Sequence, residues 1–226
     1  DSLLTTRQIV GDIFLGAGDD RIVIQQKGDF TEIYAQDGDD VLDLRGAAHV
    51  STGTTIAGGA DDDVYIVSRR NLLLVESGGE GSDTIRSTVS FTLGTNFDDL
   101  VLIGTRAISA TGNSAANVLV GNNADNKLFG LAGADQLRGG LGNDRLEGGG
   151  NTDRFYFEAH TGRDVITDFS DTVDVIDLSK YAGIDGFGDV SVKDTGDDAV
   201  ITLLHGDKIV LKDFDAGDVG GGDFDF

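Results

Sequence analysis

The hydrophobic positions between Gly112 and Tyr156 recur every nine residues. Read in nines, this stretch gives five consecutive units without insertion, namely GNSAANVLV, GNNADNKLF, GLAGADQLR, GGLGNDRLE and GGGNTDRFY. Glycine opens every unit. Position eight is apolar, with Leu119, Leu128, Leu137, Leu146 and Phe155. Position six carries a side-chain oxygen, with Asn117, Asn126, Asp135, Asp144 and Asp153. The pattern predicts one structural unit repeated five times.

Each unit is predicted to be a six-residue turn followed by a three-residue strand. Residues i and i+2 of a strand share a face, so the strand can bury position eight and keep the polar group of position six at its mouth. The glycines that open the unit allow a tight turn with positive φ. Such a unit is too small to bury a core alone, so the units must stack.

Four looser turns precede this block in residues 1 to 100. Each ends in an aspartate that is followed two residues later by an apolar side chain. These are Asp20, Asp40, Asp63 and Asp83, at spacings of 20, 23 and 20 residues. We expect the acids just before three of them, Asp19, Asp39 and Asp62, to face water and to serve mainly solubility. Between the turns and the block, Ser90 to Gly104 alternates apolar and polar residues and predicts core strands.

The nine-residue period stops after Tyr156. Val173 to Leu178 alternates again, and the segments Ala199 to Leu204 and Lys208 to Leu211 predict a hairpin. An open end of stacked strands exposes unpaired backbone and apolar side chains, which a cap would cover. We therefore expect this tail to form a small antiparallel β cap.

Composition narrows the partners of the chain. It has 226 residues, of which 39% are hydrophobic, and this is enough to bury a core. A formal charge of −23 at pH 7, from 40 acidic and 17 basic residues, makes nucleic acid and anionic membranes poor partners and a cation the natural counterweight. No apolar run approaches the length of a membrane span, and the chain has no cysteine. Because it lacks an initiating methionine, we expect a soluble segment of a longer protein.

Common catalytic signatures are missing from the sequence. It contains no EF-hand loop, GxxxxGK phosphate loop, HExxH or GxSxG motif. His49, His160 and His205 lie far apart and are expected to be turn or surface residues. We therefore expect no enzyme activity in this chain.

The repeated units resemble the GGxGxDxUx nonapeptides of the RTX, or haemolysin-type, calcium-binding family. The unit GGLGNDRLE, residues 139–147, matches that pattern at every defined position. The resemblance implies an all-β fold, a parallel β-roll that binds several Ca²⁺ ions in its turns, followed here by the β cap. It also implies a secreted or cell-surface protein of a Gram-negative bacterium, exported by the type I secretion machinery.

The same resemblance suggests the calcium ligands. Calcium takes six to eight oxygens and accepts backbone carbonyls. In a GGxGxD turn, positions two, four and six offer two carbonyls and a carboxylate, and the facing turn two units along supplies the other half. In the block these positions are Leu131, Gly133, Asp135, Gly140, Gly142, Asp144, Gly149, Asn151 and Asp153, with Asn117 and Asn126 as weaker position-six ligands. In the looser turns they are Gly16, Gly18, Asp20, Gln36, Gly38, Asp40, Gly59, Asp61, Asp63, Gly79, Gly81 and Asp83. Asp164 and Asp168 are expected as closing ligands beyond the last unit.

A coil of such a roll uses two nonapeptides, which pairs Asp135 with Asp153 and Asn126 with Asp144. The longer spacing in residues 1 to 100 predicts calcium turns on one edge only, with the opposite edge replaced by connections such as Lys27 to Ile33, His49 to Thr55 and Arg69 to Val75. We therefore expect three regions. They are a degenerate roll at 1–111, the regular block at 112–156, and a cap with a candidate secretion signal at 157–226.

We expect a monomeric, non-catalytic module that folds on Ca²⁺ binding outside the cell and supports the secretion and stability of an attached functional domain. Two alternatives stay open. One is a polysaccharide-binding module of a secreted carbohydrate-modifying enzyme such as a mannuronan epimerase, with Arg138, Arg145 and Arg154 as a basic stripe for an anionic polysaccharide. The other is an adhesin or surface-layer assembly module.

Overall fold

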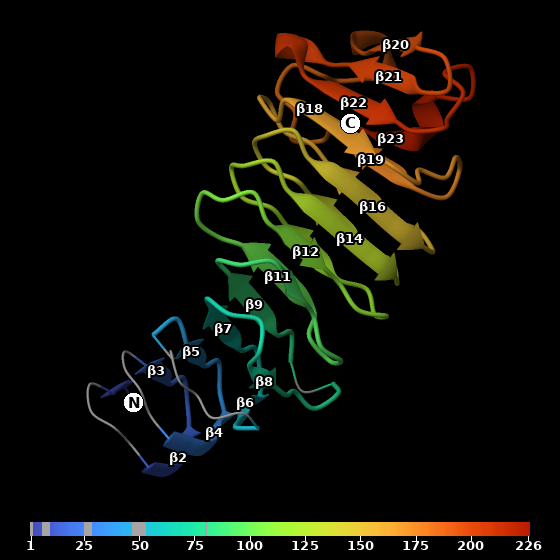
Figure 1. Cartoon of the computed structure of the whole chain (residues 1–226). Coiled ribbons are helices and arrows are strands. Elements are labelled where there is room, and N and C mark those ends of the chain that lie inside the picture. Colours follow the sequence, from blue (N-terminus) through green and yellow to red (C-terminus); the bar gives the residue numbers. More distant parts are fainter. Residues whose placement is uncertain (1, 6–9, 25–28, 47–52, 80) are drawn as a thin grey trace. The chain divides into compact units, whose positions relative to one another are not determined.

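The computed structural model describes residues 2–5, 10–24, 29–46, 53–79 and 81–226. The chain divides into two compact units, Asp1–Val101 (unit 1) and Leu102–Phe226 (unit 2). Short β-strands and tight turns make up nearly all of both units (Figure 1). In the described part of the chain, no helix is both long and apolar enough to cross a membrane. Parts of the predicted connections Lys27 to Ile33 and His49 to Thr55 lie outside the described residues.

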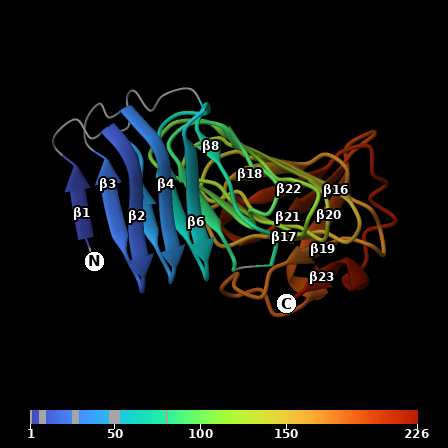
Figure 2. The same cartoon turned by 90° about the horizontal axis from the view of Figure 1, so that it is seen from below.

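Unit 1 consists of two parallel sheets whose strands alternate along the chain. The first sheet contains β1 (Ser2–Thr5), β3 (Arg21–Ile24), β5 (Val41–Asp43), β7 (Val64–Val67) and β9 (Thr84–Ser87). The second contains β2 (Val10–Ala17), β4 (Asp29–Asp37), β6 (Thr55–Ala60) and β8 (Leu73–Leu74). Figure 2 shows β2, β4 and β6 side by side. The chain thus winds as a solenoid, one strand in each sheet per coil.

The core of unit 1 lies between its two sheets. The residue two positions after each turn aspartate is fully buried, namely Ile22, Leu42, Tyr65 and Ile85. The second sheet contributes Ile33 and Ile56, which pair in register on β4 and β6. Two short strands, β10 (Phe91–Thr92) and β11 (Asp99–Leu102), end the unit. Leu100 and Leu102 of β11 are buried, as expected for a core strand, and Leu93 and Phe97 are buried in the connection between β10 and β11.

Unit 2 repeats this winding with a shorter period. One sheet contains β13 (Val118–Val120), β15 (Gln136–Arg138), β17 (Arg154–Tyr156), β19 (Val175–Asp177) and β23 (Phe224–Asp225). The other contains β12 (Ser109–Thr111), β14 (Lys127–Ala132), β16 (Arg145–Gly150), β18 (Arg163–Ile166) and β22 (Lys208–Leu211). Leu119 pairs with Leu137 and Leu128 with Leu146, so partners are 18 residues apart. All position-eight side chains are fully buried, as the nine-residue pattern predicts.

The C-terminal end adds the antiparallel part. β20 (Ser191–Asp194), β21 (Ala199–Thr202) and β22 pair antiparallel, which confirms the predicted hairpin. Single 3₁₀ turns at Phe187–Asp189, Leu204–Gly206 and Gly221–Asp223 join these elements. The segment 173–178, which we expected in the cap, instead contains roll strand β19, parallel to β17. The fold is therefore the predicted parallel β-roll with a small antiparallel cap, and the division at 111 and 156 stays a prediction.

Candidate metal centre

The turns at the strand junctions share an unusual backbone conformation at positions two and four. In seven turns both positions have positive φ, from 75° at Asp61 to 142° at Gly81. They are Gly16, Gly18, Gln36, Gly38, Gly59, Asp61, Gly79, Gly81, Leu131, Gly133, Gly140, Gly142, Gly149 and Asn151. Four of these residues are not glycine, although positive φ is disfavoured for other residues. The turn shape is therefore retained even where the glycine is replaced.

Backbone carbonyl oxygens lie between successive coils at these turns. A Cβ atom added to Gly149 would lie 2.0 Å from the carbonyl oxygen of Leu131, one coil earlier. A Cβ added to Gly81 would lie 2.0 Å from the carbonyl oxygen of Asp61. Glycine is required at these places because the carbonyl of the neighbouring coil occupies the space of a side chain. The turns that contain Gly59, Gly81, Gly133, Gly140 and Gly149 therefore face oxygen atoms from the coil before them.

The position-six aspartates are buried and connect the coils. Each one uses Oδ1 to accept a hydrogen bond from the backbone N–H of the position-six residue one coil earlier. Asn126 donates to Asp144 at 2.7 Å, and Asp135 donates to Asp153 at 2.9 Å. In unit 1 the same bonds join Asp20, Asp40, Asp63 and Asp83, at 2.6 to 3.1 Å. The structure thus brings together the residue pairs that we expected to share an ion.

The second oxygen of these carboxylates has no partner within the protein. Oδ2 is buried and accepts no hydrogen bond in Asp40, Asp63, Asp135, Asp144 and Asp153. A Cβ added to Gly130 would lie 2.4 Å from Asp135 Oδ2 and 2.4 Å from the carbonyl oxygen of Gly148, so these two oxygens are neighbours. A buried carboxylate oxygen without a partner is costly. Carboxylate and carbonyl oxygens together are the ligands that calcium prefers, so these residues fit calcium.

Burial also changes the protonation of these groups. Loss of hydration raises the pKa of Asp63 and Asp164 from 3.8 to about 8, and that of Asp153 to about 7. The pKa values of Asp83, Asp135 and Asp144 rise to about 6 for the same reason. Without a cation, these buried carboxylates therefore hold protons more tightly than exposed carboxylates do.

The two asparagine turns are closed differently. Oδ1 of Asn117 accepts a hydrogen bond from the N–H of Asn113 at 2.8 Å, and Oδ1 of Asn126 accepts one from Asn122 at 2.7 Å. Positions two and four of both turns have negative φ. The amide oxygen therefore serves its own turn, and weak calcium ligation by these asparagines stays a prediction.

Three acids close the ladders beyond the last unit. Asp164 Oδ1 accepts a hydrogen bond from the N–H of Asp144 at 2.8 Å. Asp168 accepts from the N–H groups of Gly148 and Gly149, at 3.0 and 2.7 Å. Asp174, which the sequence analysis did not select, accepts from the N–H of Asp153 at 2.9 Å. The sequence does contain a signal for this role, because Asp174 precedes a buried apolar residue by two positions, as the position-six residue does in every repeat.

The acids at position five do more than face water. Asp19, Asp39 and Asp62 are exposed, as expected. However, Asp19 Oδ1 accepts from the N–H of Asp39 at 3.2 Å, and Asp39 Oδ1 accepts from that of Asp62 at 3.1 Å. Asp62 in turn accepts from Ser82 at 2.7 Å. They therefore also form an outer row of coil-to-coil hydrogen bonds, and their role in solubility stays a prediction.

The three arginines proposed as a basic stripe do not form one. Arg138 and Arg154 lie on β15 and β17 of one sheet, whereas Arg145 lies on β16 of the other. Successive nine-residue units alternate between sheets, which separates Arg145 from the other two. Arg154 is also paired with Asp177 at 2.7 Å.

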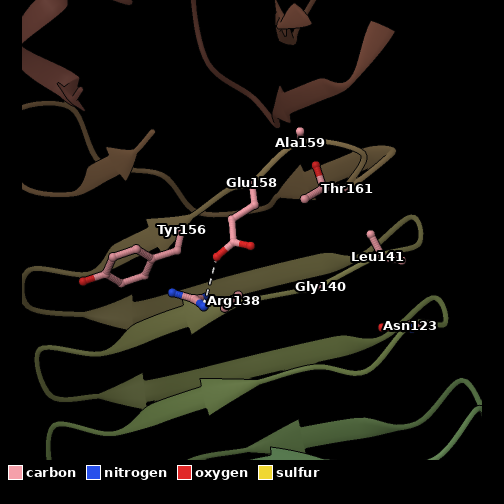
Figure 3. Close-up of a pocket in the computed structure, with 8 residues that line it drawn as sticks. All are labelled: Asn123, Arg138, Gly140, Leu141, Tyr156, Glu158, Ala159 and Thr161. Carbon is pink, nitrogen blue, oxygen red and sulfur yellow. Dashed lines mark ion pairs between the residues drawn. The ribbon is translucent and has the colours of Figure 1, made fainter. Parts of the chain in front are cut away.

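Arg138 instead lines a pocket of about 190 Å³ in unit 2 (Figure 3). Its guanidinium lies 5.5 Å from the centre of the Tyr156 ring and 3.1 Å from a carboxylate oxygen of Glu158. The remaining lining residues are Asn123, Gly140, Leu141, Ala159 and Thr161. The pocket therefore combines an aromatic face with charged and polar groups.

Comparison with known proteins locates the repeat. The family model for the RTX calcium-binding nonapeptide repeat matches residues 111–146 and 131–159. Over 69 residues the chain is 38% identical to endo-1,3-1,4-beta-glycanase ExsH of Rhizobium meliloti strain 1021. That match covers 30% of this chain and 15% of the glycanase, so the chain spans only a small part of this relative.

Two solved structures are similar to this chain at a low level. One is the AlgE6R3 subunit of the Azotobacter vinelandii mannuronan C5-epimerase, with a TM-score of 0.44 and 26% identity over 59% of this chain and 81% of that one. The other is the extracellular lipase LipA of Serratia marcescens, with a TM-score of 0.35 and 18% identity over 100% of this chain and 42% of that one. The repeat match shows that residues 111–159 of this chain carry the RTX calcium-binding nonapeptide repeat, as the sequence predicts.

Proposed function

We propose that this calcium-binding RTX module folds when calcium binds its turns. The observation that carries the proposal is the row of buried carboxylate oxygens, in Asp40, Asp63, Asp135, Asp144 and Asp153, that have no hydrogen-bond donor. In the turn of Asp135 this oxygen neighbours the backbone carbonyl of Gly148 in the next coil, so closing the roll without a cation brings negative atoms together in a region of low dielectric. An ion between the coils converts this repulsion into attraction. Because the site exists only in the folded chain, the free energy of calcium binding contributes directly to the free energy of folding.

The net charge of −23 favours the same behaviour over the whole chain. At low calcium the charges repel, and the chain stays extended. The calcium concentration outside cells is high enough to fill sites with the dissociation constant of about 10⁻⁴–10⁻³ M that is typical of extracellular modules. We propose that the chain passes the type I secretion machinery unfolded and closes outside the cell. The ligand set is that of the sequence analysis, with Asp174 added.

The module is proposed to serve an attached domain rather than to catalyse a reaction itself. Its relative ExsH is named as a glycanase, and this chain covers 15% of that protein. We therefore propose that the longer protein includes a separate functional domain that the roll helps to export and stabilise. An adhesin or surface-layer role stays an alternative for the same calcium-bound roll.

Asp144→Asn tests the proposed ligand role. Asparagine keeps the Oδ1 acceptor for the N–H of Asn126 but removes the charge. We expect the variant to bind fewer calcium ions and to need severalfold more calcium to fold, as measured by isothermal titration calorimetry and circular dichroism. The matched control is Asp39→Asn, which keeps the acceptor in an exposed row and should retain the wild-type ion count. Equal losses in both variants would contradict the assignment of position six.

Acidity should affect the calcium-free and calcium-bound chains in opposite directions. Burial raises the pKa of Asp63 from 3.8 to about 8 and that of Asp135 to about 6, so the calcium-free folded chain binds more protons than the unfolded chain. Its stability is therefore greatest near pH 4 and is lost as pH rises toward 8. With excess chelator we expect β structure to increase from pH 8 to pH 5. With calcium, protons compete for the ligands, so the calcium concentration needed for folding should rise over the same range. A β content in chelator that does not change with pH would oppose this account.

The pocket lined by Arg138 and Tyr156 supports a second candidate function. In this candidate a sugar ring stacks on the Tyr156 ring. Arg138 then binds a carboxylate of the sugar, and Glu158 accepts a hydrogen bond from one of its hydroxyl groups. The chain would then bind the polysaccharide on which an attached domain acts.

If this pocket binds polysaccharide, Arg138→Ala should weaken binding to alginate in the presence of calcium at least tenfold. Arg145→Ala is the matched control, because Arg145 lies on the other sheet and should leave binding unchanged. Affinity electrophoresis or calorimetry with alginate oligomers measures both. Wild-type protein that does not bind, or variants that bind equally, would rule out this candidate.

A further inference from the structure

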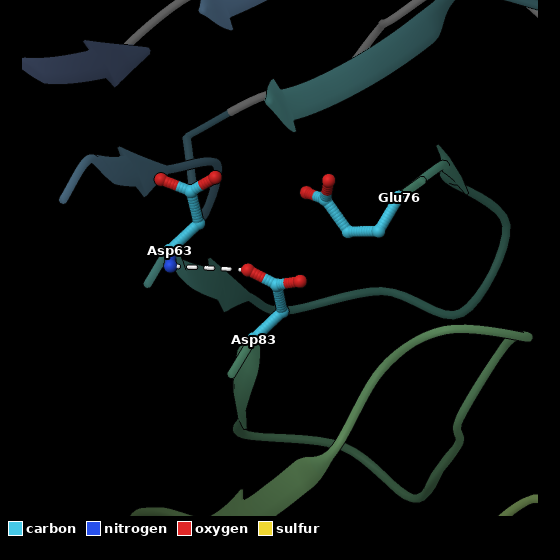
Figure 4. Close-up of side chains that lie close together, drawn as sticks. All are labelled: Asp63, Glu76 and Asp83. Atoms are coloured by element: carbon cyan, nitrogen blue, oxygen red, sulfur yellow. Dashed lines mark hydrogen bonds between the residues drawn. The ribbon is translucent and has the colours of Figure 1, made fainter. Parts of the chain in front are cut away.

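Unit 1 contains three buried carboxylates that meet at one point. One carboxylate oxygen from each of Asp63, Glu76 and Asp83 lies within 4.8 Å of the other two (Figure 4). Their exposed fractions are 0%, 6% and 2%. Asp63 and Asp83 occupy position six of successive turns, and the N–H of Asp63 donates to Asp83 at 3.1 Å. Glu76 belongs to no repeat turn, and no resemblance assigns it a role.

The local fold explains how Glu76 reaches this point. Strand β8 pairs with β6 only as far as Leu74, and the N–H of Val75 makes the last ladder bond, to Ile56. The next amides on β6 belong to Gly58 and Gly59. Glu76 accepts hydrogen bonds from both, at 3.0 and 3.4 Å. Its carboxylate thus takes the place of the next strand at the turn that contains Asp63.

Unit 2 builds the same arrangement with a different acid. Strand β18 pairs with β16 as far as Ile166, and Thr167 makes the last ladder bond, to Leu146. Asp168, two residues after the strand, then accepts hydrogen bonds from Gly148 and Gly149. Glu76 and Asp168 therefore occupy equivalent places. Glu76 differs because it is buried and because its carboxylate oxygen lies within 4.8 Å of those of both Asp63 and Asp83.

An unpartnered oxygen points to a ligand at this cluster. Asp63 Oδ2 is buried and accepts no hydrogen bond. It lies 1.9 Å from where a Cβ of Gly58 would be, and Gly58 is the residue whose N–H donates to Glu76. Three carboxylates around one such oxygen repel one another unless a cation lies between them. The neighbouring Tyr65 hydroxyl also hydrogen-bonds Glu76 and so fixes its orientation.

We propose that Asp63, Glu76 and Asp83 form a three-carboxylate cation site that fills before the other turns of the roll. The site rests on the proposed calcium function in its two repeat aspartates and goes beyond it in Glu76. A divalent ion leaves one negative charge at this site, whereas a trivalent ion neutralises it. Because affinity of oxygen sites rises with the number of charged ligands and with rigidity, the site binds calcium more tightly than a turn with two carboxylates, and lanthanides more tightly still.

Terbium luminescence tests the proposal. The chain has four tyrosines and no tryptophan, so terbium emission excited at tyrosine reports ions close to a tyrosine ring. Tyr65 touches the proposed site. We expect the first equivalent of Tb³⁺ to give this emission, and Glu76→Gln to weaken its binding at least tenfold. Glu147→Gln, at a half-exposed glutamate on β16 of unit 2, is the matched control and should bind as wild type. First-equivalent binding that is unchanged in Glu76→Gln would overturn the proposal.

Tyr65→Phe provides a second test that retains all three carboxylates. We expect most of the first-equivalent emission to disappear while calorimetry still detects the tight ion. Unchanged emission would place the first ion elsewhere and overturn the proposal, even if Glu76→Gln fails to fold. A wild-type chain that shows no calcium-dependent folding would contradict the proposed function but not the three-carboxylate site. If the wild-type chain folds with calcium and Glu76→Gln binds the first equivalent of Tb³⁺ as tightly as wild type, only the three-carboxylate site is contradicted.

Discussion

The structure depends on the second oxygen of a repeated, buried aspartate. Oδ1 of each such residue connects two coils through a backbone N–H, which places the carboxylate between coils and out of water. Oδ2 is then buried and accepts no hydrogen bond in five aspartates of the described chain, and in Asp135 it neighbours the carbonyl oxygen of Gly148. Only a cation or a proton resolves this conflict. The same residue therefore sets the spacing of the coils and creates the need for an ion between them.

The rest of the fold follows from that arrangement. Glycine or a positive φ at positions two and four brings carbonyl oxygens of successive coils together. The apolar residue at position eight then falls into the core, where Leu137 and Leu146 have no exposed surface. No coil buries a core alone, so each is stable only against its neighbours. Ion binding between two coils thus affects the packing of both, which couples metal affinity to the stability of the stack.

Much of this could be predicted from the sequence, because local spacing encodes it. The period of nine predicted the buried leucines and the aspartate pairs, but not the positive φ of Leu131 and Asn151, because positive φ was expected of the opening glycines. Other features depend on where strands stop pairing. Glu76 reaches the turn of Asp63 because β8 ends at Leu74, and no repeat pattern contains that information. The coil-to-coil bonds of Asp39 and the position of β19 in the roll likewise depend on neighbours in space. The separation of Arg145 from Arg138 could have been predicted from the sequence, because consecutive nine-residue units alternate between the two sheets.

The most direct measurement of the central claim is far-ultraviolet circular dichroism of the chelator-treated chain at pH 8 during a calcium titration. At this pH the position-six carboxylates are ionised in the unfolded chain. Folding then has to bring these negative charges together, and calcium is the cation that neutralises them. The account predicts a largely disordered spectrum in chelator and a steep, cooperative gain of β structure as calcium rises. A chain that is equally rich in β structure in excess chelator would contradict it.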